Sequence, residues 1–414
     1  MVLLANEQRL QADIDVLKQI SELCEEGTTR IGFTSEYRAG VEYFKSQMER
    51  AGLSVREDSI GNVYGRLEGT ETGRPAIVSG SHLDTVRCAG AYDGIAGAVC
   101  ALEAARMLKE NGAALKHPYE VMGIIEEEGT RFGQVLLGSK FAAGQFQDRD
   151  KDVIKDPRIG QTLRQILTEY ACPDACPALR QTNEIAAFLE LHDEQGPLLE
   201  AEGSDIGIVE NIVAISWLTV TVTGFAGHAG TVPMPLRQDA ATGAARLISY
   251  IADYTTVNFA YSATATIGKM KLIPGSSNCI PSRCVFTVDL RSGRMANIEE
   301  LTQSIKAKAA EIAGECNVEI HVNIDSRQDP IEMDSGLRDL LKQSCEGLGY
   351  SYRDIDSGAG HDAMIFSSRW PAAMIFVPCV KGITHNPEEY VHPEFLVKGA
   401  DVLYKTILAL DQKK

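Results

Sequence analysis

The chain has 414 residues, of which 44% are hydrophobic and 23% are charged, a composition typical of a globular protein with enough apolar material for two or three domains. This composition excludes a disordered chain, a collagen-like repeat and a small disulfide-stapled protein. With 40 Lys and Arg against 57 Asp and Glu, the formal net charge is −17, which argues against a nucleic-acid partner bound through a broad basic surface.

The sequence also gives no sign of a membrane or export segment. No apolar run reaches the roughly 18 residues that span a bilayer, and the first residues turn polar without forming the hydrophobic core of a signal peptide. The ten cysteines are scattered, and only Cys172 and Cys176 lie close together. We therefore expect reduced thiols in a cytoplasmic protein with no membrane partner.

The first part of the chain predicts alternating helices and buried strands. Apolar residues recur at helical spacing through the first 60 residues. The apolar runs at 75–80, 120–125 and 372–377 predict buried strands, and the small-residue segment 93–108 predicts a helix after the first of them. This alternation predicts an α/β fold with a mostly parallel central sheet.

The middle of the chain has a different pattern. Strands that alternate with period two are expected at 217–223, 263–267, 284–290 and 318–324, with helices at 235–254 and 297–313. The order β-α-β-β-α-β is that of a ferredoxin-like α+β domain. We expect residues 1–212 and 329–414 to form a catalytic domain that is interrupted by a smaller inserted domain, 213–328.

Potential metal ligands follow the predicted strands. His82 comes directly after the first apolar run, Asp93 opens the next helix, and Glu128 follows the next strand. Parallel sheets bind ligands at the carboxyl ends of their strands, and His, Asp and Glu together can hold a divalent cation. Asp84 could orient the His82 imidazole through its second ring nitrogen.

Three adjacent carboxylates, 126–128, follow the second strand. They cannot all bind one metal because successive side chains diverge, but one can bind while its neighbour stays free as a base, as metal-assisted hydrolysis requires. Taken singly, each feature has a simpler interpretation: a solvated charge run for the glutamates, a surface loop for His192 and a turn for His385. Their shared position after apolar strand-like runs favours one metal site.

Six motifs extend this pattern over nearly the whole chain: GSHLDT at 80–85, YDG at 92–94, EEEGTRF at 126–132, ELHDEQG at 190–196, GFAGHAGT at 224–231 and SGAGHDA at 357–363. They resemble the hydantoinase/carbamoylase branch of the M20 metallopeptidase and aminoacylase superfamily. That branch contains N-carbamoyl-L-amino acid hydrolases, allantoate and ureidoglycolate amidohydrolases and β-ureidopropionases.

The resemblance implies two divalent metal ions per subunit, Zn²⁺ or Mn²⁺, although Co²⁺ and Ni²⁺ suit the same donors. Glu127 would be the general base, and Asp84 would orient the His82 imidazole through the ring nitrogen that does not bind metal. The implied ligands are His82 and His192 on one metal, Glu128 and His385 on the other, and Asp93 bridging both.

The resemblance also implies residues that bind the substrate, and it makes the inserted domain a lid and dimerisation domain. His228 would stabilise the transition state, in the active site of the partner subunit of a homodimer, and Arg291 would hold a substrate carboxylate with its guanidinium fork. On their own, these two residues would be a loop histidine and a solvent-facing charge at a strand end. The other implied substrate-binding residues are Gln195, Asn278, Gly360 and His361.

The sequence therefore predicts a metal-dependent hydrolase of a linear amide or ureido C–N bond beside a carboxylate, with an N-carbamoyl-L-amino acid as the first candidate substrate. Allantoate is the alternative, because segment 87–91 departs from the Asn-Gly-Gly of carbamoylases and is closer to some allantoate amidohydrolases. Asp193 also stands at a position that is usually apolar in this branch. A β-ureidopropionase, an aminoacylase or dipeptidase, and a non-catalytic metal-binding module are further alternatives.

Overall fold

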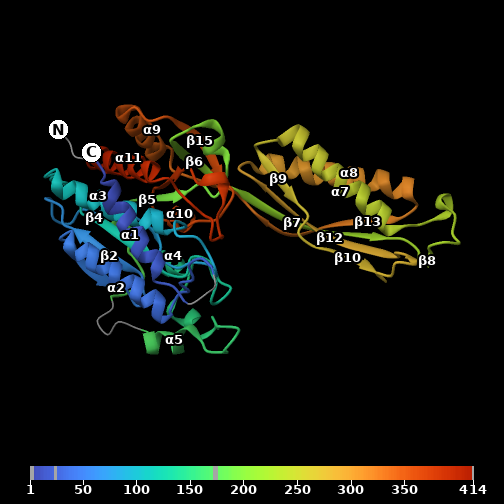
Figure 1. The fold of residues 1–414 in the computed structure, drawn as a ribbon, viewed down its shortest axis with the longest axis horizontal. Helices are drawn as coiled ribbons and strands as arrows, with labels where there is room; N and C mark the ends of the chain where they lie inside the picture. The colour runs from blue at the N-terminus through green and yellow to red at the C-terminus, as the bar shows by residue number, and fades with distance from the viewer. Residues whose placement is uncertain (1–3, 23–25, 171–175, 413–414) are drawn as a thin grey trace. The chain divides into compact units, whose positions relative to one another are not determined.

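The computed structural model describes residues 4–22, 26–170 and 176–412, and the chain divides into two compact units (Figure 1). Unit 1 comprises Met1–Glu210, Met333–Ile355 and Gly360–Lys414, and unit 2 comprises Asn211–Glu332 and Asp356–Ala359. The eight cysteines in the described ranges are free thiols, whereas Cys24 and Cys172 lie outside those ranges. None of the helices described has the length and apolar character needed to cross a bilayer.

Unit 1 is built on a mixed sheet. Its strands are β1 (Ser54–Glu57), β2 (Val63–Leu67), β3 (Ala76–His82), β4 (Tyr119–Ile124), β5 (Ile185–Asp193), β6 (Ile206–Ile212), β15 (Tyr352–Ser357) and β16 (Ala372–Val377). They lie in the order β1-β2-β4-β3-β5-β16-β6, with β15 also paired to β6, and the short strand β14 (Ile331–Glu332) pairs with the end of β6 as the ninth strand. The central strands β4, β3, β5 and β16 run parallel, but β1, β2 and β6 pair antiparallel. The prediction of a mostly parallel sheet is corrected: only its centre is parallel.

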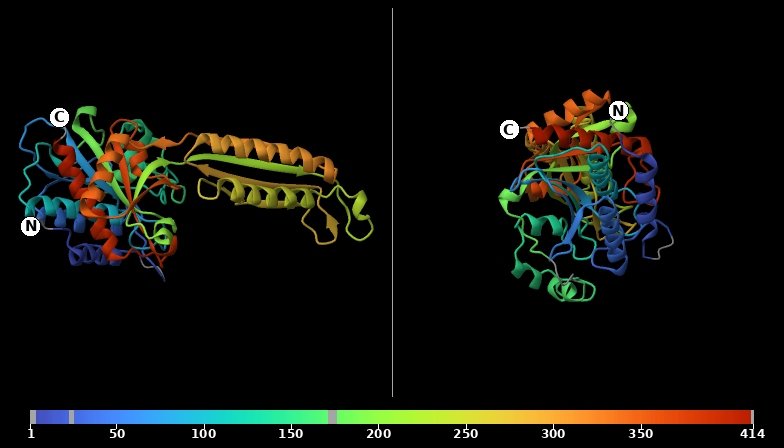
Figure 2. Two further views of the ribbon diagram at one scale, coloured as in Figure 1. Left: turned by 90° about the horizontal axis from the view of Figure 1, so that it is seen from above. Right: turned by 90° about the vertical axis from the view of Figure 1, so that its left-hand side faces the viewer.

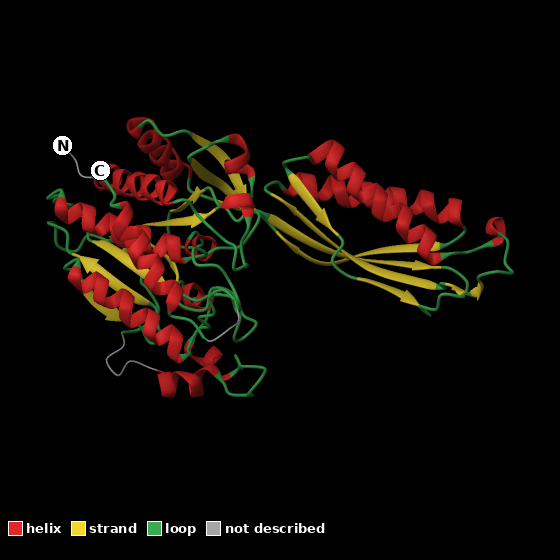
Figure 3. Cartoon of the chain, in the orientation of Figure 1, coloured by secondary structure: helices red, strands yellow, loops and turns green. Residues whose placement is uncertain are grey.

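The three apolar runs predicted as buried strands are confirmed as β3, β4 and β16. Every residue of these strands is buried, because helices or loops cover both faces of the sheet centre. The helices of unit 1 are α1 (Glu7–Gln19), α2 (Ser35–Arg50), α3 (Ile95–Glu110), α4 (Leu137–Ala142), α5 (Leu163–Tyr170), α6 (Leu198–Glu202), α9 (Ser335–Leu348), α10 (Asp362–Phe366) and α11 (Pro393–Gln412) (Figure 3). Helix α3 is buried along nearly its whole length between the sheet and α11, which explains its run of small residues.

Unit 2 has a separate antiparallel sheet. Its elements are β7 (Ala214–Thr223), β8 (Gly227–His228), α7 (Ala240–Phe259), β9 (Ala263–Thr266), β10 (Met270–Ile273), β11 (Cys279–Ile280), β12 (Arg283–Ser292), α8 (Met295–Cys316), β13 (Glu319–Gln328) and β14 (Ile331–Glu332). The sheet order is β10-β12-β7-β13 with β9 also on β12, and β8 pairs with β11 apart from it.

Helices α7 and α8 run side by side along one face of the unit 2 sheet (Figure 2). Leu218, Val220 and Val222 of β7 are fully buried beneath them, whereas Trp217 on the other face is half exposed. This arrangement is the physical basis of the alternating sequence pattern. Helix α7 begins five residues later than predicted, because Asp239 caps its first turn by accepting hydrogen bonds from Ala241 N and Thr242 N.

Candidate metal centre

Four parallel strands bring the predicted ligands to one edge of the unit 1 sheet. His82 is the last residue of β3 and lies beside Ile124 at the end of β4, after which the chain continues to 126–128. His192 is the penultimate residue of β5 and lies beside Phe376 of β16, which leads to His385. Because the carboxyl ends of parallel strands coincide, side chains far apart in sequence meet at this edge.

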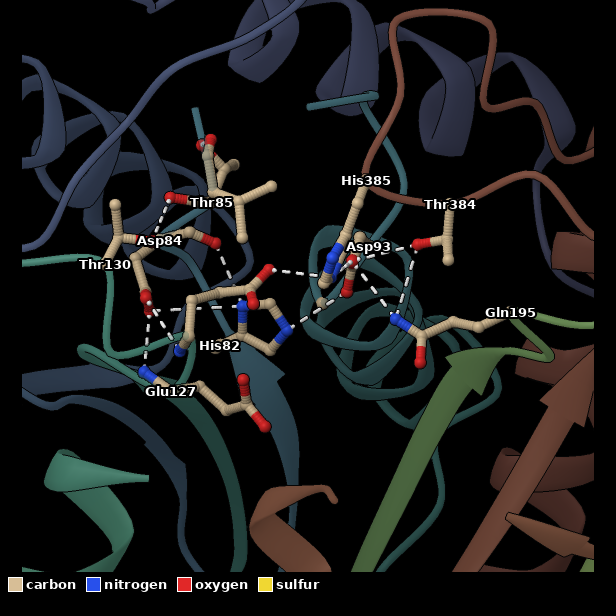
Figure 4. A network of polar contacts seen from close by, with 12 residues as sticks. His82, Asp84, Thr85, Asp93, Glu127, Thr130, Gln195, Thr384 and His385 are labelled. Carbon is tan, nitrogen blue, oxygen red and sulfur yellow. Dashed lines mark hydrogen bonds and ion pairs between the residues drawn. The ribbon is translucent and has the colours of Figure 1, made fainter. Parts of the chain in front are cut away.

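Asp93 lies at the centre of the site, and its two carboxylate oxygens face different groups (Figure 4). Oδ1 is 3.3 Å from His82 Nε2 and 3.2 Å from His192 Nε2. Oδ2 is 3.1 Å from His385 Nε2, which is also 3.5 Å from Glu128 Oε1. The structure thus gathers the five predicted ligands into two groups that share Asp93, and within each group the ligand atoms lie within 4.8 Å of one another.

The tautomers of two histidines follow from their other ring nitrogens. His82 Nδ1 lies 2.9 Å from the main-chain oxygen of Asp84, and His192 Nδ1 lies 3.0 Å from that of Asp193. A carbonyl oxygen only accepts, so Nδ1 carries the proton in both rings. Nε2 is then the ring nitrogen left for a metal, and in both rings it faces Asp93.

Asp84 acts differently from the sequence-based expectation. Its main-chain carbonyl orients His82, while its carboxylate Oδ1 is 3.9 Å from His82 Nδ1. The carboxylate instead accepts hydrogen bonds from the main-chain N–H groups of Glu127 at 3.1 Å and Glu128 at 3.2 Å. One side chain thus fixes the backbone of both predicted functional glutamates.

The three adjacent glutamates have three different environments. Glu126 is fully buried at φ 55°, and its Oε1 accepts hydrogen bonds from Arg131 N at 2.7 Å and Phe132 N at 3.2 Å, which fixes the following loop. Glu128 Oε1 accepts no hydrogen bond from the described residues and faces His385. Glu127 belongs to neither ligand group, and its side chain extends past the His82 ring (Figure 4).

The pKa directions show an excess of negative charge at the site. Burial raises the pKa of Glu127 well above its ordinary value, with the neighbouring carboxylates of Asp362, Glu128 and Asp84 adding to the shift. Burial and Asp93 raise the pKa of Glu128 to about 7. Burial alone would lower the pKa of His82, but Asp93, Glu127 and Asp84 together raise it well above its usual range.

These residues fit divalent cations. The donors are imidazole nitrogens and carboxylate oxygens, the set that Zn²⁺ and Mn²⁺ accept, and they converge with their lone pairs inward. Glu128 Oε1 is buried without a hydrogen-bond donor among the described residues, so a cation would satisfy it. Gly94, at φ 68°, allows the close approach of the His82 ring, because a Cβ there would lie 2.4 Å from His82 Nε2.

Two residues that support Asp93 were not found by sequence analysis. Thr384 Oγ1 donates to Asp93 Oδ2 at 3.1 Å, and Glu389 Oε1 accepts from the main-chain N–H groups of Tyr92 at 2.7 Å and Asp93 at 2.9 Å. Their only sequence signal is closeness to His385, and Glu389 follows another glutamate in what looks like a surface charge pair. Gln195, expected to contact substrate, donates from Nε2 to Asp93 Oδ2 at 3.1 Å.

The structure places His361 and the two unusual segments close to the ligands. His361, which follows Gly360, is buried with its ring centroid 4.5 Å from that of His192, and burial and His192 hold its pKa well below the usual range. Asp193 Oδ1 lies 3.1 Å from His192 Nδ1, so this residue contacts the ring nitrogen of His192 that faces away from Asp93. In segment 87–91, Gly90 packs against the Glu389 side chain.

The remaining predicted residues belong to unit 2. His228 pairs with Cys279 across β8 and β11, and the main-chain oxygen of Asn278 accepts a hydrogen bond from Ala229 N at 3.0 Å, so His228 and Asn278 are near neighbours. Arg291 is not free within the unit: its Nη2 donates to Asp289 Oδ2 at 3.0 Å and its Nη1 to the Gly358 oxygen at 2.8 Å.

The unit 1 sheet presents histidines and carboxylates that can bind metal, and beside them Glu127, a carboxylate that belongs to neither ligand group. This arrangement is typical of a metal-dependent hydrolase. Comparison with known proteins agrees. The chain belongs to peptidase family M20/M25/M40, whose family model matches residues 79–409.

Three relatives illustrate the similarity. The chain is 39% identical to an N-carbamoyl-L-amino-acid amidohydrolase of Paenarthrobacter aurescens over 412 residues, 99% of each chain. It is 35% identical to an allantoate amidohydrolase of Escherichia coli over 390 residues, 94% of each. A solved structure of a hydantoinase/carbamoylase family amidase from Burkholderia multivorans superposes with a TM-score of 0.91 at 34% identity and covers 99% of both chains.

Proposed function

We propose that this chain is a two-metal amidohydrolase that cleaves an N-carbamoyl-L-amino acid into the amino acid, carbon dioxide and ammonia. The observation that carries the proposal is Asp93, which offers one carboxylate oxygen to each of two ligand groups. The name of the Paenarthrobacter aurescens relative, N-carbamoyl-L-amino-acid amidohydrolase, supports this choice of substrate.

His82, His192 and Asp93 would hold one cation, and Glu128, His385 and Asp93 the other. When bound, two such cations lower the pKa of water and polarise the carbonyl group under attack. The residues around them keep the donors in place: the main-chain carbonyls behind His82 and His192 fix the rings, and Thr384 and Gln195 hold Asp93 Oδ2.

Glu127 moves the proton. Its carboxylate accepts a proton from the attacking water and returns it to the leaving nitrogen, so that nitrogen departs as an amine rather than as an anion. Burial raises the pKa of Glu127, so its carboxylate holds a transferred proton more readily than an exposed glutamate does. Asp84 holds the backbone of Glu127 and Glu128 at once, and this couples the position of the base to that of a ligand.

We further propose that unit 2 is the lid and dimerisation domain of a homodimer and that His228, Asn278 and Arg291 bind the substrate. The support within unit 2 is the juxtaposition of His228 and Asn278, whereas the Arg291 guanidinium pairs with Asp289 and would have to exchange that partner for the substrate carboxylate. Mixing two inactive variants, His228→Ala and Glu127→Gln, tests the role of the partner subunit. If His228 acts across the dimer, mixed dimers regain activity. Sedimentation of a fully active monomer would contradict the proposal.

We propose a cytoplasmic location, which the eight free cysteines of the described ranges support, since thiols stay reduced there. Fractionation of the source cells tests it, and recovery of the protein outside the cytoplasmic fraction would overturn it.

Allantoate is the second candidate substrate. Segment 87–91 favours it, because this segment differs from the carbamoylase pattern and packs against Glu389, which holds the main chain of Asp93. The Escherichia coli relative named allantoate amidohydrolase supports the same reading.

The decisive experiment is a screen of ammonia release. Metal-reconstituted protein is given N-carbamoyl-L-amino acids, their D-enantiomers, N-carbamoyl-β-alanine, allantoate and ureidoglycolate at equal concentration. The proposal expects the largest kcat/KM on an N-carbamoyl-L-amino acid and little on its D-enantiomer. A larger value on allantoate would select the second candidate, and no ammonia from any of these substrates would contradict both.

A further inference from the structure

A second cavity in unit 1 is lined by four arginines. It has a volume of about 620 Å³, within the range of small-molecule sites, and Arg56, Arg66, Arg74 and Arg180 line it together with Glu120 and Glu184. Arg66 and Arg74 also pair with Glu68 at 2.8 Å and Glu71 at 2.7 Å, so each of the four guanidinium groups has an acidic neighbour. Four arginines in one cavity are a local concentration of hydrogen-bond donors in a chain whose net charge is −17.

The sheet builds this arrangement. Arg66 lies opposite Glu120 across β2 and β4, and Arg56 lies on the neighbouring strand β1. Gly65 faces Met48 of α2, so by strand alternation Arg66 points to the opposite face of the sheet. Glu120 lies four residues before the end of β4, about 13 Å along the strand, and the metal centre lies beyond that end.

One buried carboxylate serves three guanidinium groups. Glu120 is 1% exposed, and its oxygens accept hydrogen bonds from Arg66 Nη1 at 2.8 Å and Arg180 Nη1 at 2.9 Å, with Arg56 Nη2 at 3.5 Å. The Arg180 side chain is only 5% exposed, yet no described residue accepts a hydrogen bond from its Nη2 or from Nη2 of Arg66. Neither Nη2 is among the buried polar atoms that lack a partner, so both are open to solvent and available to a ligand in the cavity.

The guanidinium groups are held in place without an anion. The Tyr64 ring lies under Arg56, with 3.9 Å from Cζ to the ring centroid, and under Arg180 at 5.2 Å. The remaining acidic partner of Arg180 is Glu184, which is 45% exposed, so its ion pair is weakened by solvent and gives way readily to a better acceptor.

We propose that this cavity binds a small phosphate-bearing anion. A phosphate group presents several oxygens, which can accept hydrogen bonds from several guanidinium groups at once. A single carboxylate is a poorer match, because it brings one charge and two oxygens, and Glu120 already fills that role.

Calorimetric titration of the metal-loaded protein with inorganic phosphate at constant ionic strength tests the proposal. We expect wild type to bind, and Arg56→Gln and Arg74→Gln to bind about tenfold more weakly, since each loses a charge-assisted hydrogen bond. Arg246→Gln is the matched control, because Arg246 pairs with Glu315 on the surface of unit 2 and should leave the affinity unchanged. Among the described residues Arg74 pairs only with the exposed Glu71, so its variant keeps the test valid if Arg56→Gln does not fold.

Two further titrants identify the source of the phosphate and exclude other anions. Tighter binding of adenosine monophosphate than of inorganic phosphate would identify an organic phosphate, and equal binding would identify the free ion; both support the proposal. No binding to wild type, unchanged affinity in both arginine variants, or binding of succinate in place of phosphate would overturn it.

Discussion

Replacing Glu127 with Gln removes the proposed base and keeps nearly the same side-chain size. The variant should fold, because the main-chain N–H of Glu127 is held by Asp84 Oδ1 and its carbonyl by Leu136 N, and the substitution alters neither contact. Glu127 belongs to neither ligand group, so the metal content should be that of wild type. Loss of general-base catalysis should lower kcat by about 10²–10⁴-fold, or about 2.7–5.4 kcal/mol of transition-state stabilisation, with KM little changed.

The neighbouring glutamates provide matched controls for this variant. Glu126→Gln keeps an oxygen that can accept from Arg131 N and Phe132 N, so kcat should stay within about tenfold of wild type. Glu128→Gln should instead lose bound metal along with activity. Steady-state ammonia release and metal analysis of the three purified variants give the comparison. Equal losses of kcat in Glu126→Gln and Glu127→Gln, or loss of metal from Glu127→Gln, would refute the reasoning.

Three further predictions follow from the geometry. The His385 side chain is 48% exposed, but those of His82 and His192 are buried, so a chelator should remove one ion per chain faster than the other; loss of both at a single rate would contradict this. Glu120→Gln leaves buried guanidinium groups without their carboxylate and should cost about 3–5 kcal/mol in urea unfolding at pH 7. Burial alone would raise the pKa of Glu120, but Arg180 and its other arginine neighbours lower it. The stability that the ionised Glu120 adds is therefore fully present above the unfolded pKa of about 4.3, and it is lost as the pH falls through the lower pKa of the folded state. The stability gap between wild type and Glu120→Gln should therefore narrow in acid, and a gap independent of pH would be evidence against this ion-pair network. Arg291→Lys should raise KM by about tenfold or more with kcat nearly constant, because Lys lacks the bidentate fork; an unchanged KM for every carboxylate substrate would remove Arg291 from the substrate site.

The buried centre of the fold could be predicted from the sequence, and the sheet edges could not. Strands β3, β4 and β16 are buried throughout and largely apolar because they are covered on both faces, and their runs therefore stand out in the sequence. Strands β1 and β2 were missed because they are only four and five residues long, and β1 lies within the first 60 residues, where helical spacing was expected. The antiparallel direction of these edge strands depends on tertiary pairing that no local pattern encodes.

The site, too, has parts that the sequence could predict and parts that it could not. Side chains at strand ends could be predicted because parallel strands make the meeting point a consequence of topology. The parts supplied by the main chain could not: the carbonyls that orient His82 and His192, and the N–H groups of Tyr92 and Asp93 held by Glu389, leave no mark in the residue types.

The shared role of Asp93 is the central claim, and crystallography with anomalous scattering from the bound metal tests it most directly. We expect two peaks on either side of Asp93, one about 2.0–2.2 Å from Nε2 of His82 and of His192, and the other at the same distance from Glu128 and His385. A single peak, or two peaks that do not share Asp93, would contradict the account.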